Sequence, residues 1–476
     1  MNQLRAAMVG FDITPRFHPQ YGAWGTTPLV TELDMPLLAR CLVLEQADCR
    51  IVWFGSDLCG EPVPFTLQLR EQVAGALGMT VEQVIWSTSQ SHSTGALPGS
   101  VMSGSAITKK VAIDRDFIDA ERARFMNAYV DAAGRAIAAL KPAQVSAGRG
   151  HCDSIGYNSR FPMPTGGCKF SRNYLEGLQS GKYFDPTIGL LRFDDDAGAP
   201  IGIIFNYCCH PAVLIRNKHC SSDWVGTARQ CIEQAIDGAP AMFVQGFCGD
   251  VHPRHMFGGP QQAAILGRRL GQAAVRALPT LVPAASGPLN LTWKPVEFAC
   301  QPMPTVAECR QQMAECEAYI EEVTQRDPAA TWVCGYNHPD PWLFSPEERA
   351  AGTQLSVDYF RKLIAMIDAG KQLPRTLSIT VGALRIGDVA AVLSPGENFT
   401  ITGDRVRRRS PFVHTLICGD TNGLFGYIGT DDEIDRGGAE TRNSWRLTAM
   451  GGYRLPLAKG SAARITDTFV GMLQDL

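Results

Sequence analysis

The stretch IGIIFNYCCHPAVLIRNKHCSSDWVG, Ile201 to Gly226, organises the rest of the chain. Its apolar beginning is short and predicts a buried β-strand, which the proline after His210 ends. In α/β proteins, catalytic and binding residues often lie at the ends of strands. Asp223 follows a polar loop, at the predicted start of a helix. A histidine and an acid in these positions can meet in one cleft, although a histidine bonded only to backbone carbonyls would give the same pattern.

The composition describes a globular protein with an ample core. Of 476 residues, 45% are hydrophobic and 19% are charged. The net charge is −3 and the longest basic run is Arg407–Arg409, which argues against nucleic-acid binding. The N-terminus lacks the apolar region of a signal peptide, and no run reaches transmembrane length. The 15 cysteines are scattered through apolar stretches, as in a reduced protein, so we expect a cytoplasmic location.

Other predicted strands also end in polar loops that carry candidate functional residues. The strand Val84–Trp86 opens into STSQSHSTG, which contains His92. The strand Ile51–Phe54 runs into Gly-Ser-Asp57. The remaining loops of this kind are QGFCGDVHP (245–253), SPGENFT (394–400) and GDTNGLFGYIGT (419–430). Helical spacing between the strands predicts an α/β protein, with a helical insert near residues 301–372.

Seven short motifs carry a resemblance to a known family. FDITP, STSQSHSTG, GYNSRFP, NYCCHPAVL…SSDWVG, VQGFCGDVHPR, SPGENFT and GLFGYIGT occur in this order. Their order and spacing resemble those of the N-terminal catalytic domain of the neutral/alkaline (non-lysosomal) ceramidase family, over nearly the whole chain. The resemblance implies a divergent member with a mixed β-sheet core covered by helices. It also implies one catalytic domain over residues 1–476, without the family's C-terminal immunoglobulin-like domain.

The resemblance also implies a metal site. The family hydrolyses an amide with one zinc ion held by two histidines, a glutamate and a tyrosine. His210, Glu397 and Tyr427 match three of these ligands, and Gln90 stands where the other histidine would be. An amide oxygen is a poor substitute for imidazole. Either His92 takes over as ligand, or a different divalent metal is bound, or no metal is kept; His252 is another nearby candidate.

The remaining site residues follow from the same comparison. His92 aligns with a histidine that contacts substrate, and Arg160 lies in a substrate-contacting loop. We therefore expect His92, Tyr427 and Arg160 to be catalytic. Carboxylates often orient ligating histidines, and Asp57, Asp223 and Asp250 are expected to do so here.

The predicted function is hydrolysis of an amide or ester bond in a soluble small molecule by metal-activated water, with zinc or another divalent ion. Two alternatives remain open, because a fold does not fix its chemistry. One is a carbohydrate-active lyase or hydrolase on the same scaffold. The other is a non-catalytic binding protein that has lost its metal.

Overall fold

The centre of the protein is a mixed nine-stranded sheet. The structure is a computed structural model that describes residues 3–16, 30–94, 114–163, 167–330, 344–438, 440–441 and 454–476. In spatial order the strands are β13 (Ala241–Gln245), β11 (Pro200–Tyr207), β10 (Thr187–Asp195), β6 (Lys141–His151), β1 (Arg5–Asp12), β3 (Leu38–Gln46), β4 (Cys49–Ser56) and β5 (Val84–Thr88), and β15 (Val282–Pro283) pairs with β6. The pairs β4/β5 and β11/β13 are parallel, and the other neighbours are antiparallel.

One face of this sheet is covered by helices. They are α1 (Val63–Leu77), α2 (Arg115–Ala138), α4 (Asp223–Ala235) and α5 (Gly259–Ala277). The apolar run of β11 is explained by burial on both faces: Phe205 packs towards the helices, whereas Ile204 packs towards a second sheet.

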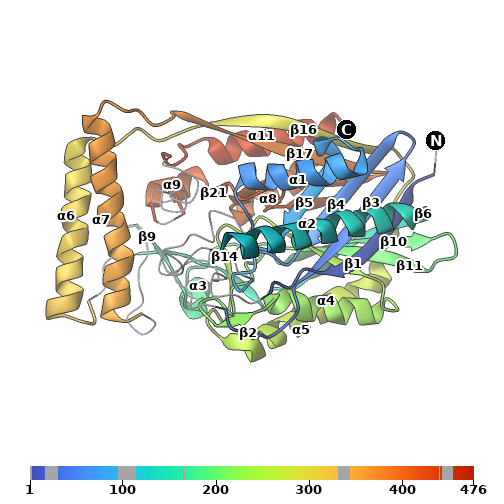
Figure 1. Cartoon of the computed structure of the whole chain (residues 1–476), viewed down its shortest axis with the longest axis horizontal. Coiled ribbons are helices and arrows are strands. Elements are labelled where there is room, and N and C mark those ends of the chain that lie inside the picture. Colours follow the sequence, from blue (N-terminus) through green and yellow to red (C-terminus); the bar gives the residue numbers. More distant parts are fainter. Residues whose placement is uncertain are drawn as a thin grey trace.

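The second sheet covers the opposite face. Its strands are β16 (Leu289–Ala299), β17 (Thr376–Ile386), β18 (Val389–Leu393) and β20 (His414–Cys418), in that order. Leu393 and Leu416 face the large sheet, whereas Val392 and Ile417 face α8 (Thr400–Arg409) and α11 (Ser461–Gln474). The molecule therefore has four layers, helices–sheet–sheet–helices (Figure 1). This agrees with the predicted α/β class and mixed sheet.

Short elements build the loops at the strand ends. The two-stranded pairs are β2 (Glu32–Leu33) with β12 (His219–Cys220), β7 (Gly156–Asn158) with β14 (Val251–Pro253), β8 (Arg160–Pro162) with β9 (Cys168–Phe170), and β19 (Gly396–Asn398) with β21 (Gly426–Ile428). The short helices are α3 (Tyr174–Gln179), α9 (Asp431–Arg436) and single turns at Val81–Gln83, Leu278–Thr280 and Glu322–Arg326.

Two long helices form a hairpin at one end of the molecule. α6 (Val306–Glu321) and α7 (Pro346–Asp368) lie side by side at the left of Figure 1, within the predicted helical insert. Each begins with a capping box, Thr305 with Glu308 and Ser345 with Glu348. Glu348 also pairs with Arg216, which lies in the loop that follows His210. The end of the hairpin at which α7 begins is thus tied to that loop.

The loops at several strand ends converge because backbones approach closely. A Cβ on Gly55 in β4 would lie 2.8 Å from the carbonyl oxygen of Phe243 in β13, so only glycine allows this approach. The side chain of Gln245 then donates to the backbone oxygen of Ser89 at 2.9 Å. Ser394 and Cys418 are joined by a backbone hydrogen bond of 2.9 Å. The ends of β5, β13, β18 and β20 therefore surround one region.

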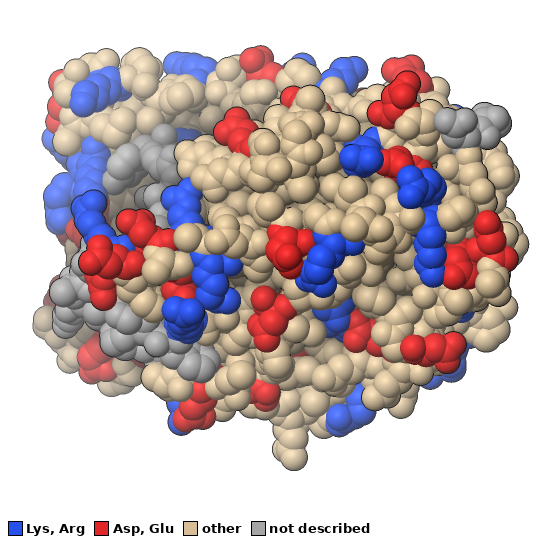
Figure 2. Space-filling model, turned by 45° about the vertical axis from the view of Figure 1, so that its right-hand side comes forward, with Lys and Arg blue, Asp and Glu red and all other residues tan. Residues whose placement is uncertain are grey.

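The surface carries mixed charge. On the face drawn in Figure 2, Lys and Arg side chains are interspersed with Asp and Glu side chains, in keeping with a net charge of −3. None of the helices in the described ranges is long and apolar enough to cross a membrane.

Candidate active site

His210 and Glu397 meet in the region where the strand ends converge. His210 Nε2 lies 3.4 Å from Glu397 Oε2, and both residues are buried. His210 Nδ1 is 2.9 Å from the carbonyl oxygen of Val251. A carbonyl only accepts, so Nδ1 carries a proton, and Nε2 is the ring nitrogen that faces Glu397. Glu397 Oε2 has no hydrogen-bond partner among the described residues.

Tyr427 joins this pair through the short parallel sheet. Glu397 in β19 is the register partner of Tyr427 in β21, so the two side chains leave the same face. The phenol lies within hydrogen-bonding reach of the Glu397 carboxylate. Burial and the negative charge of Glu397 raise the pKa of Tyr427 well above its ordinary value, so the free phenol stays protonated.

Two further histidines flank His210. The His252 ring stacks on the His210 ring with centroids 4.3 Å apart, and its Nδ1 is 3.0 Å from Ser159 Oγ. The His92 ring centroid lies 5.6 Å from that of His210. Burial, with His210 as a second cause, lowers the pKa of His92 to about 3. His92 is therefore a neutral imidazole at neutral pH.

Gln90 is near the site but is engaged with a cysteine. Its Oε1 accepts a hydrogen bond from Cys248 Sγ at 3.3 Å. Its backbone φ is 62°, in the left-handed region that residues other than glycine seldom adopt. Cys248 precedes Gly249, at which a Cβ would lie 2.3 Å from the carbonyl oxygen of Glu397. Cys248 thus lies next to the backbone of Glu397, and the side chain of Gln90 contacts that cysteine.

The three aspartates expected to orient histidines have other partners. Asp57 forms a bidentate ion pair with Arg229, at 2.9 and 2.8 Å. Asp223 accepts from the backbone amides of Leu214 and Trp224, which shapes the loop after His210. Asp250 accepts from Asn158 and from the amide of Thr400. These carboxylates brace the loops that carry the site, whereas a backbone carbonyl orients the His210 ring.

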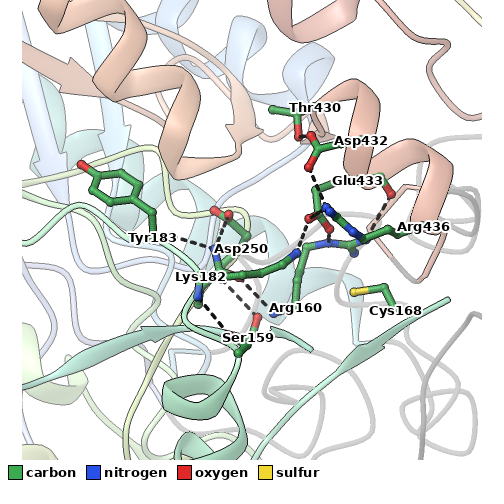
Figure 3. A network of polar contacts seen from close by, with 12 residues as sticks. Ser159, Arg160, Cys168, Lys182, Tyr183, Asp250, Thr430, Asp432, Glu433 and Arg436 are labelled. Carbon is green, nitrogen blue, oxygen red and sulfur yellow. Dashed lines mark hydrogen bonds and ion pairs between the residues drawn. The ribbon is translucent and has the colours of Figure 1, made fainter. Parts of the chain in front are cut away.

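Arg160, which we expected to contact a substrate, binds other parts of the protein. Its guanidinium is buried and binds the carboxylate of Glu433 (Figure 3). It also binds the carboxylate of Glu440 and the backbone oxygens of Glu433 and Gly437. It also lies 5.2 Å from the ring of Phe399. Its hydrogen-bond donors hold the segment that follows Tyr427. The expected contact with a substrate stays a prediction.

Sequence reasoning missed two features. Asp420 comes shortly after the apolar strand β20, just as Asp57 comes after β4. This pattern in the sequence could have identified Asp420 as a candidate site residue. Its Oδ1 has no hydrogen-bond partner among the described residues, and burial and the charge of Glu397 raise its pKa well above its usual range. The second feature leads outward from His252: Phe170 packs on its ring, Arg172 lies over Phe170, and Phe344, just before α7, contacts Arg172.

The donors suit a divalent ion only in part. In the described portion of the chain, no three His, Cys, Asp or Glu side chains are grouped as a metal site. The His210–Glu397 pair becomes a three-donor set when the Tyr427 phenol is counted. Two ligands about 2.1 Å from a tetrahedral ion are about 3.4 Å apart, which matches the distance between His210 Nε2 and Glu397 Oε2. The buried, unpartnered Oε2 also favours a cation at this place.

Comparison with known proteins supports the fold. No protein-family model and no curated protein matches the chain. Among solved structures, the neutral ceramidase from Pseudomonas aeruginosa is similar, with 18% identity and a TM-score of 0.64 over 99% of this chain and 74% of that chain. A ceramidase complexed with C2 is similar at 18% identity and a TM-score of 0.66, over 99% of this chain and 75% of that chain. The chain therefore has a neutral ceramidase-like fold in a divergent sequence.

Proposed function

We propose that this protein hydrolyses an amide or ester bond of a small molecule at the cluster of His210, Glu397 and Tyr427, with a divalent ion, zinc in the first instance, as cofactor. The observation that carries the proposal is the meeting of an imidazole nitrogen and a buried carboxylate oxygen 3.4 Å apart, with no hydrogen-bond partner for that oxygen among the described residues. The fold supports the amide class, because the similar structures are ceramidases, named for an amide lipid.

His210, Glu397 and Tyr427 would hold the ion. When bound, a divalent ion supplies an activated water and polarises the scissile carbonyl. The backbone oxygen of Val251 fixes the His210 ring so that Nε2 faces the site. Register pairing of β19 with β21 sets Tyr427 beside Glu397.

The other groups handle the substrate. The Tyr427 phenol, protonated in the free protein, donates a hydrogen bond to the carbonyl oxygen as that oxygen gains negative charge. His92 is neutral and so offers one N–H donor and one acceptor. Its place next to His210 suits it to orient the attacking water or to give a hydrogen bond to the leaving group.

A substrate panel tests the proposal against its alternatives. The purified protein, loaded with zinc, is assayed with 4-nitrophenyl acetate, 4-nitroacetanilide and 4-nitrophenyl glycosides, beside Glu397→Gln and His210→Ala. The proposal expects ester or amide cleavage that both substitutions reduce by at least about 100-fold. Cleavage of glycosides alone would favour the carbohydrate enzyme. Metal binding or ligand binding without turnover of any probe would favour the binding protein.

A further inference from the structure

The amide of Gln90 has a defined orientation. Its Oε1 lies 3.3 Å from Cys248 Sγ, and the next polar atom near that sulfur is Asp420 Oδ2 at 3.9 Å. Both neighbours of the thiol are oxygen acceptors, so the S–H group donates. Reversing the amide would replace this hydrogen bond with an N–H group directed at the sulfur, which is only a weak acceptor. The environment of Cys248 therefore favours the orientation in which Oε1 faces the thiol.

The orientation decides which atom of Gln90 serves the site. With Oε1 directed at Cys248, Nε2 lies on the other side of the same planar amide. No described residue accepts a hydrogen bond from Nε2. Unlike Glu397 Oε2 and Asp420 Oδ1, which also lack a partner among the described residues, Nε2 is not fully buried. Nε2 thus keeps some exposure and unused donor capacity. It belongs to a residue whose Oε1 contacts Cys248, and the neighbouring Gly249 lies against the backbone of Glu397.

The position of Gln90 is held firmly. The backbone oxygen of the preceding Ser89 accepts from Gln245 at 2.9 Å, and the amide of His92 donates to the carbonyl of Pro211 at 3.0 Å. The left-handed φ of 62° at Gln90 itself is a strained conformation of the kind found at functional sites. Donors that are fixed before the reaction stabilise developing charge best, because they need no reorganisation.

We propose that Gln90 is a hydrogen-bond donor to the scissile carbonyl oxygen, through Nε2, and is not a metal ligand. This inference rests on the proposed hydrolysis. As water oxygen adds to the carbonyl carbon, the π electron pair moves to the carbonyl oxygen, and the N–H of Gln90 donates to that oxygen without giving up its proton. When the bond to the leaving group breaks, the electron pair on the carbonyl oxygen re-forms the carbonyl. The leaving group departs with the bonding pair and takes up the proton that the attacking water has given up. Cys248 is the positioning residue that keeps Oε1 turned away.

The test separates a donor from a ligand. Gln90→Met keeps the length of the side chain and removes both the donor and the amide oxygen. We expect its zinc affinity, from competition with a chromogenic chelator, to stay within about threefold of the parent, while kcat on the cleaved 4-nitrophenyl acetate or 4-nitroacetanilide falls about 100- to 1000-fold. Cys248→Ala should lower kcat more than Cys248→Ser, since serine keeps a donor for Oε1. Circular dichroism checks that each variant is folded.

Each failure has its own signature. A loss of zinc affinity in Gln90→Met as large as that in His210→Ala would make Gln90 a ligand and overturn the inference, whether or not a probe is cleaved. Full activity in Gln90→Met beside an active parent would overturn it and leave the proposed hydrolysis standing. A parent that cleaves no probe would refute the proposed function, and the inference with it.

Discussion

Replacing Arg160 by methionine should destabilise the protein strongly. Methionine retains much of the apolar stem but removes the guanidinium that binds Glu433 (Figure 3) and Glu440. All three side chains are buried. Glu433 keeps Lys182 and Arg436 as partners, so the uncompensated charge falls mainly on Glu440.

The size of the loss follows from burial. Removing one partner of a buried ion pair costs about 3–5 kcal/mol, because the other charge stays in a poorly solvated place. At about 2.1 cal/mol/K per residue, the unfolding entropy of a chain of 476 residues is about 1 kcal/mol/K, so the melting temperature should fall by about 3–5 °C. Loss of the contact with the Phe399 ring adds to this in the same direction.

Thermal unfolding followed by circular dichroism measures the effect, with Arg436→Met as the matched control. Arg436 binds the same Glu433, but 40% of its side chain is exposed, so its removal should cost about 1 kcal/mol or less. Adding Glu440→Gln to Arg160→Met should restore part of the lost melting temperature, because the uncompensated charge of the buried Glu440 carboxylate is then removed. Equal melting temperatures for Arg160→Met and Arg436→Met would refute the reasoning that burial makes this clamp strong.

Three further predictions concern the site and its loops. Tyr427→Phe should keep most of the bound metal but lose about 2–4 kcal/mol of transition-state stabilisation. Zinc content and kcat are measured on one preparation, and a variant that equals the parent in both would show that the phenol has no part in the mechanism. His92→Ala should retain zinc and lower kcat by about 100-fold, whereas zinc loss as complete as in His210→Ala would make His92 a ligand. Burial raises the pKa of Asp223 from 3.8 to about 7, so the stability that it contributes is fully present below about pH 4 and is lost as the pH rises through about 7. Urea unfolding should therefore show the parent losing about 2–3 kcal/mol more than Asp223→Asn between pH 5 and 7, and parallel pH profiles would contradict this.

Much of the fold could be predicted from local patterns. The strand that enters His210, the helix after Ser222 and the helix Thr400–Arg409 follow from short apolar runs, proline and helical spacing. These patterns work because a strand buried on both faces must be apolar, and because polar loops begin where such a strand ends. The positions of His210 and Glu397 at strand ends could therefore be predicted from the sequence. That the two residues meet was expected from the family resemblance.

The roles of the charged and amide residues could not be predicted in this way. Arg160 looks like a loop residue in the sequence, since its partners Glu433 and Glu440 lie 273 and 280 positions away. Asp57 likewise follows a strand as a site residue would, and only the fold turns it to Arg229. The amide orientation of Gln90 depends on Cys248, 158 positions along the chain. Long-range pairing, which local spacing does not encode, decided each of these cases.

The central claim is that His210 and Glu397 share a divalent ion, and zinc stoichiometry tests it most directly. The parent, His210→Ala and Glu397→Gln are equilibrated with zinc, freed of excess ion by gel filtration, and analysed by inductively coupled plasma mass spectrometry. Correct folding of each variant is checked by its melting curve. The account predicts about one tightly held zinc per chain in the parent and a large loss of it in both variants, because each removes one of the two ligands that lie 3.4 Å apart. A parent that retains no zinc, or variants that retain as much as the parent, would contradict it.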